Sequence, residues 1–156
     1  MTLAAALPAC ALTAVELSWE ALQVARENAV AQGVGGRVHF VHADGTESLR
    51  GPFDLIVSNP PYVPTEATIR VIEHQLRDPA LSLDGGADGM ALHRRLLADA
   101  PRLLAPQAAL GMECAEDQAG PLRALADATP WAARTELYHD LAGRPRGLFI
   151  ESKDQW

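Results

Sequence analysis

The tetrapeptide Asn59-Pro60-Pro61-Tyr62 ends the apolar stretch FDLIVSNPPYVP, residues 53–64. Two prolines fix the backbone φ angle and remove two N–H donors, which leaves the Asn59 side chain and the Pro60 carbonyl as acceptors. A planar NH2 group can donate two hydrogens, so a rigid pair of acceptors can bind it and orient its nitrogen. Tyr62 offers a flat face for stacking and a wall against water. The four residues therefore predict a site that recognises the NH2 group of a substrate.

A purely structural interpretation of the tetrapeptide is that the prolines terminate a strand and Asn59 caps a turn. Two earlier apolar runs also end on acids, at Glu16 and at Asp44, which is followed by Gly45. In a parallel sheet the carboxyl ends of the strands lie along one edge, where ligands bind, and this favours the functional interpretation. Glu16 as a surface acid and Asp44 as a turn-stabilising residue in HADGTE remain the structural alternatives.

The elements that must position these residues alternate between strands and helices. Ser18 is predicted to cap a helix that stops at Gly33, and no sustained period is found between residues 63 and 88 apart from a short helix at Ile69–Leu76. The pattern predicts an α/β domain with a largely parallel sheet that ends in an antiparallel strand pair. The expected strands cover residues 11–15, 36–44, 51–59, 108–115, 132–140 and 146–152, and the expected helices cover residues 2–7, 18–33, 88–106 and 116–129.

Length and composition predict one domain over residues 1–156, because 48% of the residues are hydrophobic. The net charge of −7 makes a nucleic acid an improbable direct substrate, since phosphate binding depends on Lys and Arg. Cys10 and Cys114 lie far apart, and the histidines lack the spacing of ligands, so neither a disulfide nor a metal site is expected. The apolar N-terminus has no basic residue after Met1 and is too short to span a bilayer, so we expect a cytoplasmic protein without a membrane segment.

The tetrapeptide resembles the (N/D)-P-P-(Y/F) motif that follows the fourth strand of the amino-group methyltransferases that use S-adenosylmethionine. The resemblance implies a catalytic role for Asn59, Pro60, Pro61 and Tyr62. It also implies that Glu16 binds the ribose hydroxyls of the cofactor and that Asp44, with Gly45, contacts the adenine edge. Asn59 belongs to the implied cofactor-binding residues as well.

Two further segments narrow the resemblance to the release-factor glutamine methyltransferases (HemK/PrmC type) of the class I methyltransferases. RDPALSLDGGADGMALHRRLLADAPRLL (77–104) resembles their segment after the motif, and HDLAGRPRGLFIE (139–151) resembles their C-terminal strand pair. The resemblance covers residues 12–151 and implies methylation of the glutamine amide in the Gly-Gly-Gln loop of peptide-chain release factors. In this interpretation Asn59 and the Pro60 carbonyl orient the amide nitrogen, and no general base is required. A non-catalytic domain and a methyltransferase for nucleic-acid bases are the alternatives.

The sequence departs from the family at its start, because the chain contains no D-x-G-x-G-x-G loop and none of the family's first strand. We therefore expect a Rossmann-like sheet truncated at the N-terminus and weak binding of S-adenosylmethionine by these residues. Either the strand ALTAV pairs directly with FDLIVS, or the space between them is open or filled by a partner chain. The glycines of LDGGADG (83–89) form either a flexible turn or part of the substrate mouth.

Overall fold

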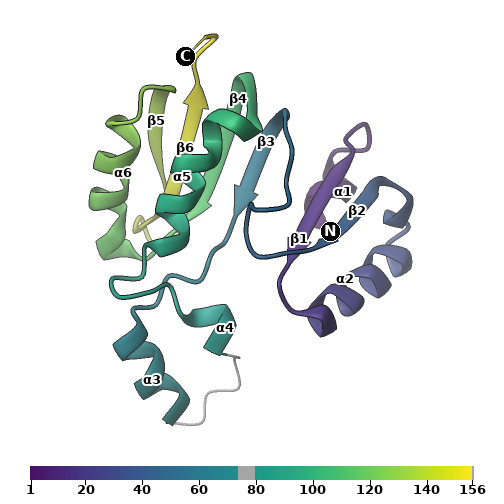
Figure 1. Ribbon diagram of the computed structural model, residues 1–156, viewed down its shortest axis with the longest axis horizontal. Helices are drawn as coiled ribbons and strands as arrows, with labels where there is room; N and C mark the ends of the chain where they lie inside the picture. Colours follow the sequence, from purple (N-terminus) through teal and green to yellow (C-terminus); the bar gives the residue numbers. More distant parts are fainter. Residues whose placement is uncertain (74–79, 156) are drawn as a thin grey trace. The chain divides into compact units, whose positions relative to one another are not determined.

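The computed structural model describes residues 1–73 and 80–155 (Figure 1). The chain forms two compact units, Met1–Leu49 and Arg50–Trp156, which we call unit 1 and unit 2. Within the described residues, no helix combines the length and the apolar character needed to cross a bilayer. The two units are described separately below.

Unit 1 is a parallel strand pair with its connecting helix. It contains α1 (Thr2–Ala6), β1 (Leu12–Glu16), α2 (Trp19–Ala31), a 3-10 turn at Gly35–Arg37 and β2 (Val38–His42). The Ser18 hydroxyl accepts a hydrogen bond from the Ala21 amide at 3.2 Å, and Gly33 adopts a φ of 68° after α2. The predicted N-cap and helix stop are therefore confirmed. A small core that includes Ala4, Ala29 and Val38 holds the unit together.

Unit 2 is a four-stranded mixed sheet in the order β3-β4-β6-β5. Its strands are β3 (Phe53–Ser58), β4 (Leu104–Glu113), β5 (Ala132–His139) and β6 (Pro145–Ser152). β3 and β4 are parallel, whereas β6 is antiparallel to both β4 and β5. The antiparallel pair predicted for the C-terminus is confirmed, and the carboxyl ends of β3, β4 and β5 share one edge.

Helices cover one face of this sheet, as Figure 1 shows for α5 (Ala91–Leu103) and α6 (Ala119–Asp127). Side chains alternate between the two faces along each strand. Those on the helix-covered face form the core together with Leu97 of α5 and Leu122 of α6. On the opposite face, Leu55 and Val57 of β3 and Phe149 of β6 are 39%, 53% and 43% exposed. The 3-10 turn Glu116–Gln118 joins β4 to α6.

The region between β3 and α5 is more regular than the sequence predicts. It contains α3 (Thr65–Glu73) and α4 (Ala80–Leu83), and α3 starts four residues before the predicted helix Ile69–Leu76. Residues 74–76 of that prediction, His74 among them, lie outside the described residues. α5 begins at Ala91 rather than at Asp88, because the Asp88 carboxylate accepts the Met90 amide at 3.1 Å in the turn that precedes the helix.

The predicted direct pairing of ALTAV with FDLIVS is wrong for the residues that the structure describes. β1 pairs with β2 alone, and β3 pairs with β4 alone, so the strands form two sheets. Side-chain pattern identifies strands but not their neighbours, which is why this pairing could not be fixed from sequence. The alternatives, an open space or one filled by a partner chain, stay predictions.

Candidate functional site

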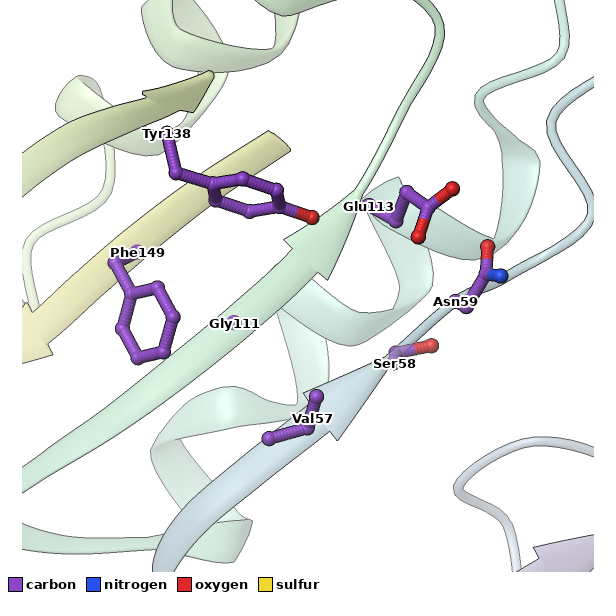
Figure 2. Close-up of a pocket in the computed structure, with 7 residues that line it drawn as sticks. All are labelled: Val57, Ser58, Asn59, Gly111, Glu113, Tyr138 and Phe149. Atoms are coloured by element: carbon purple, nitrogen blue, oxygen red, sulfur yellow. The ribbon is translucent and has the colours of Figure 1, made fainter. Parts of the chain in front are cut away.

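A cavity of about 180 Å³ lies at the carboxyl edge of the sheet in unit 2. Asn59 follows the last residue of β3 and lines this cavity, as Figure 2 shows. Its side chain is exposed, whereas Pro60 directly after it is buried. Asn59 thus lies at the cavity, and its role in binding an NH2 group stays a prediction. It is lined by Val57, Ser58, Asn59, Gly111, Glu113, Tyr138 and Phe149.

Two aromatic rings form one wall of the cavity. The Phe149 ring lies over Gly111, where an added Cβ would come within 3.3 Å of it. The Tyr138 ring lies over Gly147, where a Cβ would come within 2.3 Å of the phenol oxygen. The two rings meet edge to face, with centroids 6.5 Å apart. The missing side chains of Gly111 and Gly147 leave the space that the Phe149 and Tyr138 rings fill.

Among the described residues that line the cavity, Glu113 is the one acid. Tyr62 directs its hydroxyl to Glu113 Oε1 at 3.5 Å, the outer limit of a hydrogen bond. Burial, followed by the nearby Glu113 charge, raises the pKa of both Tyr62 and Tyr138. Both phenols therefore remain protonated at neutral pH and face a carboxylate.

The segment 83–89 packs against the backbone of the tetrapeptide. Its backbone packs so closely that a Cβ on Gly85 would lie 2.7 Å from the Pro61 carbonyl oxygen, and one on Gly89 2.2 Å from the Tyr62 carbonyl oxygen. Gln118 Nε2 donates to the carbonyl oxygens of Tyr62, at 2.8 Å, and of Asp88, at 3.2 Å. These glycines are thus part of the support of the site and not only a turn.

The predicted cofactor residues of unit 1 lie at the carboxyl ends of its strands. Glu16 ends β1, and its Oε1 accepts the Ser18 amide at 2.8 Å. Asp44 follows β2 by two residues and is exposed, and Gly45 has a φ of 54°. The Ala43 amide donates to the Glu16 carbonyl at 3.1 Å, so the turn that carries Asp44 lies beside Glu16. The structure brings Glu16, Asp44 and Gly45 together within unit 1.

Pro60, Pro61 and Tyr62 do not line the cavity, although Asn59 does. Tyr62 is partly buried, with its hydroxyl toward Glu113 and its carbonyl toward Gln118. The stacking role of Tyr62 and the acceptor role of the Pro60 carbonyl stay predictions.

Sequence reasoning missed Glu113, Tyr138 and Phe149. The signal for Glu113 was present, because it ends an apolar strand as Glu16 does, within GMECAE. Tyr138 and Phe149 gave no such signal, since only the pairing of β5 with β6 brings them to the cavity.

His93 and the two cysteines differ in how far they are buried. His93 is fully buried, with Nε2 2.7 Å from the Glu113 carbonyl oxygen, and burial lowers its pKa. Cys114 is buried, and burial raises the pKa of its thiol to about 11. Cys10 is exposed. Within residues 1–73 and 80–155, no group of three His, Cys, Asp or Glu side chains is arranged to hold a metal ion.

Comparisons with known proteins point to methyltransferases. A family profile described as methyltransferase small domain matches residues 1–90. The chain is 43% identical over 137 residues to the release factor glutamine methyltransferase of Bradyrhizobium diazoefficiens, covering 85% of this chain and 45% of that protein. It is 41% identical over 106 residues to the ribosomal protein uL3 glutamine methyltransferase of Neisseria meningitidis, covering 68% of this chain and 35% of that protein. The chain spans about half the length of the curated relatives it matches.

Solved structures share the fold. The crystal structure of a methyltransferase from Pyrococcus furiosus superposes with a TM-score of 0.65 at 18% identity, covering 92% of this chain and 64% of that one. The predicted α/β fold of the class I methyltransferases is thereby confirmed, as is the predicted resemblance to glutamine methyltransferases.

Proposed function

Because the chain belongs to the methyltransferase small-domain family, we propose that it carries the acceptor site of an S-adenosylmethionine-dependent methyltransferase acting on the side-chain amide nitrogen of a protein glutamine. The observation that carries the proposal is the position of Asn59, which lines the cavity at the carboxyl end of β3. Residues 1–156 are proposed to form a single, partial catalytic domain.

The chemistry of the substrate explains why acceptors are needed at this position. The lone pair of an amide nitrogen is conjugated with its carbonyl, so the nitrogen is a poor nucleophile and gains most from correct orientation. The Asn59 side-chain oxygen accepts one N–H of the glutamine, and the Pro60 carbonyl accepts the other. Tyr62 closes the site against water.

The residues of unit 1 fit the cofactor. S-adenosylmethionine supplies a methyl group on a positively charged sulfur, and its ribose carries two neighbouring hydroxyls. A carboxylate is the natural acceptor for such a hydroxyl pair, and the partly exposed Glu16 presents one at the end of β1. Asp44 and Gly45 are proposed to contact the adenine edge, and Asn59 is proposed as a further cofactor-binding residue.

A peptide-chain release factor is the proposed substrate, at the glutamine of its Gly-Gly-Gln loop. The relative from Bradyrhizobium is named for a release factor, whereas the relative from Neisseria is named for ribosomal protein uL3. The net charge of −7 favours a protein over a nucleic acid. The cytoplasm, where release factors work, is the proposed compartment.

Transfer of a labelled methyl group tests the proposal, with the longest in-frame protein that contains residues 1–156 as the enzyme. We expect label on the release factor and none on a version whose Gly-Gly-Gln glutamine is replaced by alanine. Asn59→Ala is expected to lower the rate by roughly 100-fold, because the nitrogen loses its orientation. Asn28→Ala, which removes an exposed asparagine of α2, is the matched control and is expected to keep the rate. Equal labelling of the alanine version of the release factor, or of uL3 in its place, would contradict the proposed substrate.

A further inference from the structure

Glu113 lines the cavity of the candidate site and has no part in the proposed function. It is the last residue of β4, and its carboxylate lines the same cavity as Asn59. In Figure 2 this carboxylate points toward the Asn59 side chain, and the Tyr138 hydroxyl points toward the carboxylate. The Tyr62 hydroxyl lies 3.5 Å from Glu113 Oε1. The Glu113 carboxylate thus faces Asn59 and Tyr62 of the tetrapeptide and Tyr138 of β5.

The backbone of Glu113 is fixed by contacts with two other elements, β6 and α5. Its carbonyl oxygen lies 2.7 Å from Nε2 of the buried His93, and its Cα pairs in register with Gly147 of β6. The next residue, Cys114, donates its amide to the Arg146 carbonyl at 2.8 Å. The backbone at this strand end is therefore held by the pairing with β6 and by the contact with His93 of α5.

The expectation that no general base is required leaves one proton of the methylated amide without an acceptor. A nitrogen that has formed a fourth bond while keeping both hydrogens is positively charged and strongly acidic, so one proton must leave. Amide and carbonyl oxygens can hold that proton in a hydrogen bond but are too weakly basic to accept it. A carboxylate in the same cavity is basic enough to accept it at neutral pH.

Building on the proposed function, we propose that the Glu113 carboxylate accepts the proton that the substrate amide nitrogen loses during methylation. The nitrogen lone pair becomes the new N–CH3 bond, and the electron pair of the broken S–CH3 bond stays on the sulfur of the methyl donor. One N–H bond breaks, its electron pair returns to the nitrogen, and its proton becomes the O–H of a neutral Glu113. The positive sulfonium and the negative carboxylate are both neutral afterwards, so charge balances.

The charged and titratable groups around Glu113 come from several elements. Arg146 of β6 is engaged by Asp140, whose Oδ2 accepts its Nε at 3.0 Å. In the part of the chain that the structure describes, no Lys, Arg or His forms an ion pair with Glu113 within 4.0 Å. The remaining titratable neighbours are the protonated phenols, the Cys114 thiol, His93 through its contact with the backbone, and the acids Glu116 and Asp117 of the following turn.

A merely structural role for Glu113 would be to orient Tyr62. Kinetics of four variants separate the two roles. Glu113→Gln keeps the shape and a hydrogen-bond acceptor but removes the basic oxygen, and we expect kcat to fall by about 100-fold with KM changed little. Glu113→Asp is expected to recover part of this loss. Tyr62→Phe removes the hydroxyl contact and is expected to cost less than Glu113→Gln, and Glu151→Gln on β6 is the matched control outside the cavity.

Three kinetic results would overturn the proposal. The first is a Glu113→Gln enzyme within threefold of the wild-type kcat, and the second is a Tyr62→Phe enzyme that is as slow as Glu113→Gln. The third is a wild-type protein that methylates no glutamine, which removes the proposed function as well. If the wild-type protein methylates glutamine and Glu113→Gln is equally active, the proposed function stands and only the role of Glu113 as proton acceptor is wrong.

A measurement without any turnover tests the arrangement in the 156-residue chain itself. Burial and, after it, the Glu113 charge raise the pKa of both Tyr62 and Tyr138, so Glu113→Gln, which removes the charge, is expected to make these tyrosines ionise at lower pH. The chain has no other tyrosine, and ultraviolet absorbance of tyrosinate reports both directly. Glu151→Gln is expected to leave the titration unchanged. A titration that is identical in Glu113→Gln and the wild type would show that the carboxylate does not face the phenols, and the proposal would be wrong.

Discussion

Replacement of Gly89 by alanine tests whether the segment 83–89 supports the tetrapeptide. Gly89 has a φ of 74°, and a Cβ there would lie 2.2 Å from the Tyr62 carbonyl oxygen and 2.4 Å from Gln118 Nε2. The left-handed backbone costs an alanine about 1–2 kcal/mol. The collision with a backbone oxygen adds about 1–3 kcal/mol, because Tyr62 or the segment itself must move. We therefore expect the free energy of unfolding of unit 2 to fall by about 2–5 kcal/mol.

Gly143 provides the matched control for this variant. It has a φ of 78°, yet nothing lies within 4 Å of the Cβ that an alanine would add there. Gly143→Ala therefore carries the backbone strain of about 1–2 kcal/mol without the collision. The difference between the two variants, about 1–3 kcal/mol, measures the packing of Gly89 against the tetrapeptide.

Urea unfolding followed by tryptophan fluorescence measures both variants in unit 2. Trp131 is buried there, with Nε1 donating to the Leu97 carbonyl at 3.2 Å. Replacing Trp19 and Trp156 by phenylalanine leaves Trp131 as the sole reporter. A Gly89→Ala variant that is no less stable than Gly143→Ala would refute the close packing of the tetrapeptide on this segment.

Three further predictions follow from individual contacts. Burial lowers the pKa of His93, so the unfolded chain binds more protons than the folded chain as the pH falls below about 6.5. Unit 2 is therefore expected to lose up to about 1.4 kcal/mol of stability per pH unit in that range. A His93→Gln variant whose stability has the same pH dependence would contradict this. Ser18→Ala removes the cap of α2 and is expected to lower the free energy of unfolding of unit 1 by about 1 kcal/mol, measured by urea unfolding followed by circular dichroism. An unchanged unfolding midpoint would contradict the role of Ser18 as a cap. Iodoacetamide at pH 7.5 is expected to modify the exposed Cys10 but not the buried Cys114, whose thiol pKa is raised to about 11, and mass spectrometry that finds both modified would contradict the packing of β4.

The local elements could be predicted because their signals are local. Ser18 and Gly33 mark the ends of α2, and the apolar run before Asn59 marks β3, each through the chemistry of a few neighbouring residues. The position of Asn59 at a strand end followed from the same kind of signal. The start of α5 was misplaced because Asp88 serves the preceding turn and pairs with Arg94 instead of capping the helix.

The rest of the site depends on contacts between distant parts of the chain. Tyr62 and Glu113 are 51 residues apart, and only the parallel pairing of β3 with β4 brings them together. Tyr138 reaches the cavity through β6, which pairs with both of its neighbours in the sheet. A single sequence contains no record of strand order, so the acid and the phenols of the cavity could not be assigned to one site.

The identity of the methylated atom is the most direct test of the account. Tandem mass spectrometry of a release factor, after incubation with S-adenosylmethionine and the longest in-frame protein containing residues 1–156, locates the added methyl group. We predict one methyl group on the side-chain nitrogen of the Gly-Gly-Gln glutamine, and its loss with Asn59→Ala. A methyl group on any other residue, or the same product from Asn59→Ala, would contradict the central claim that Asn59 orients an amide nitrogen for methylation.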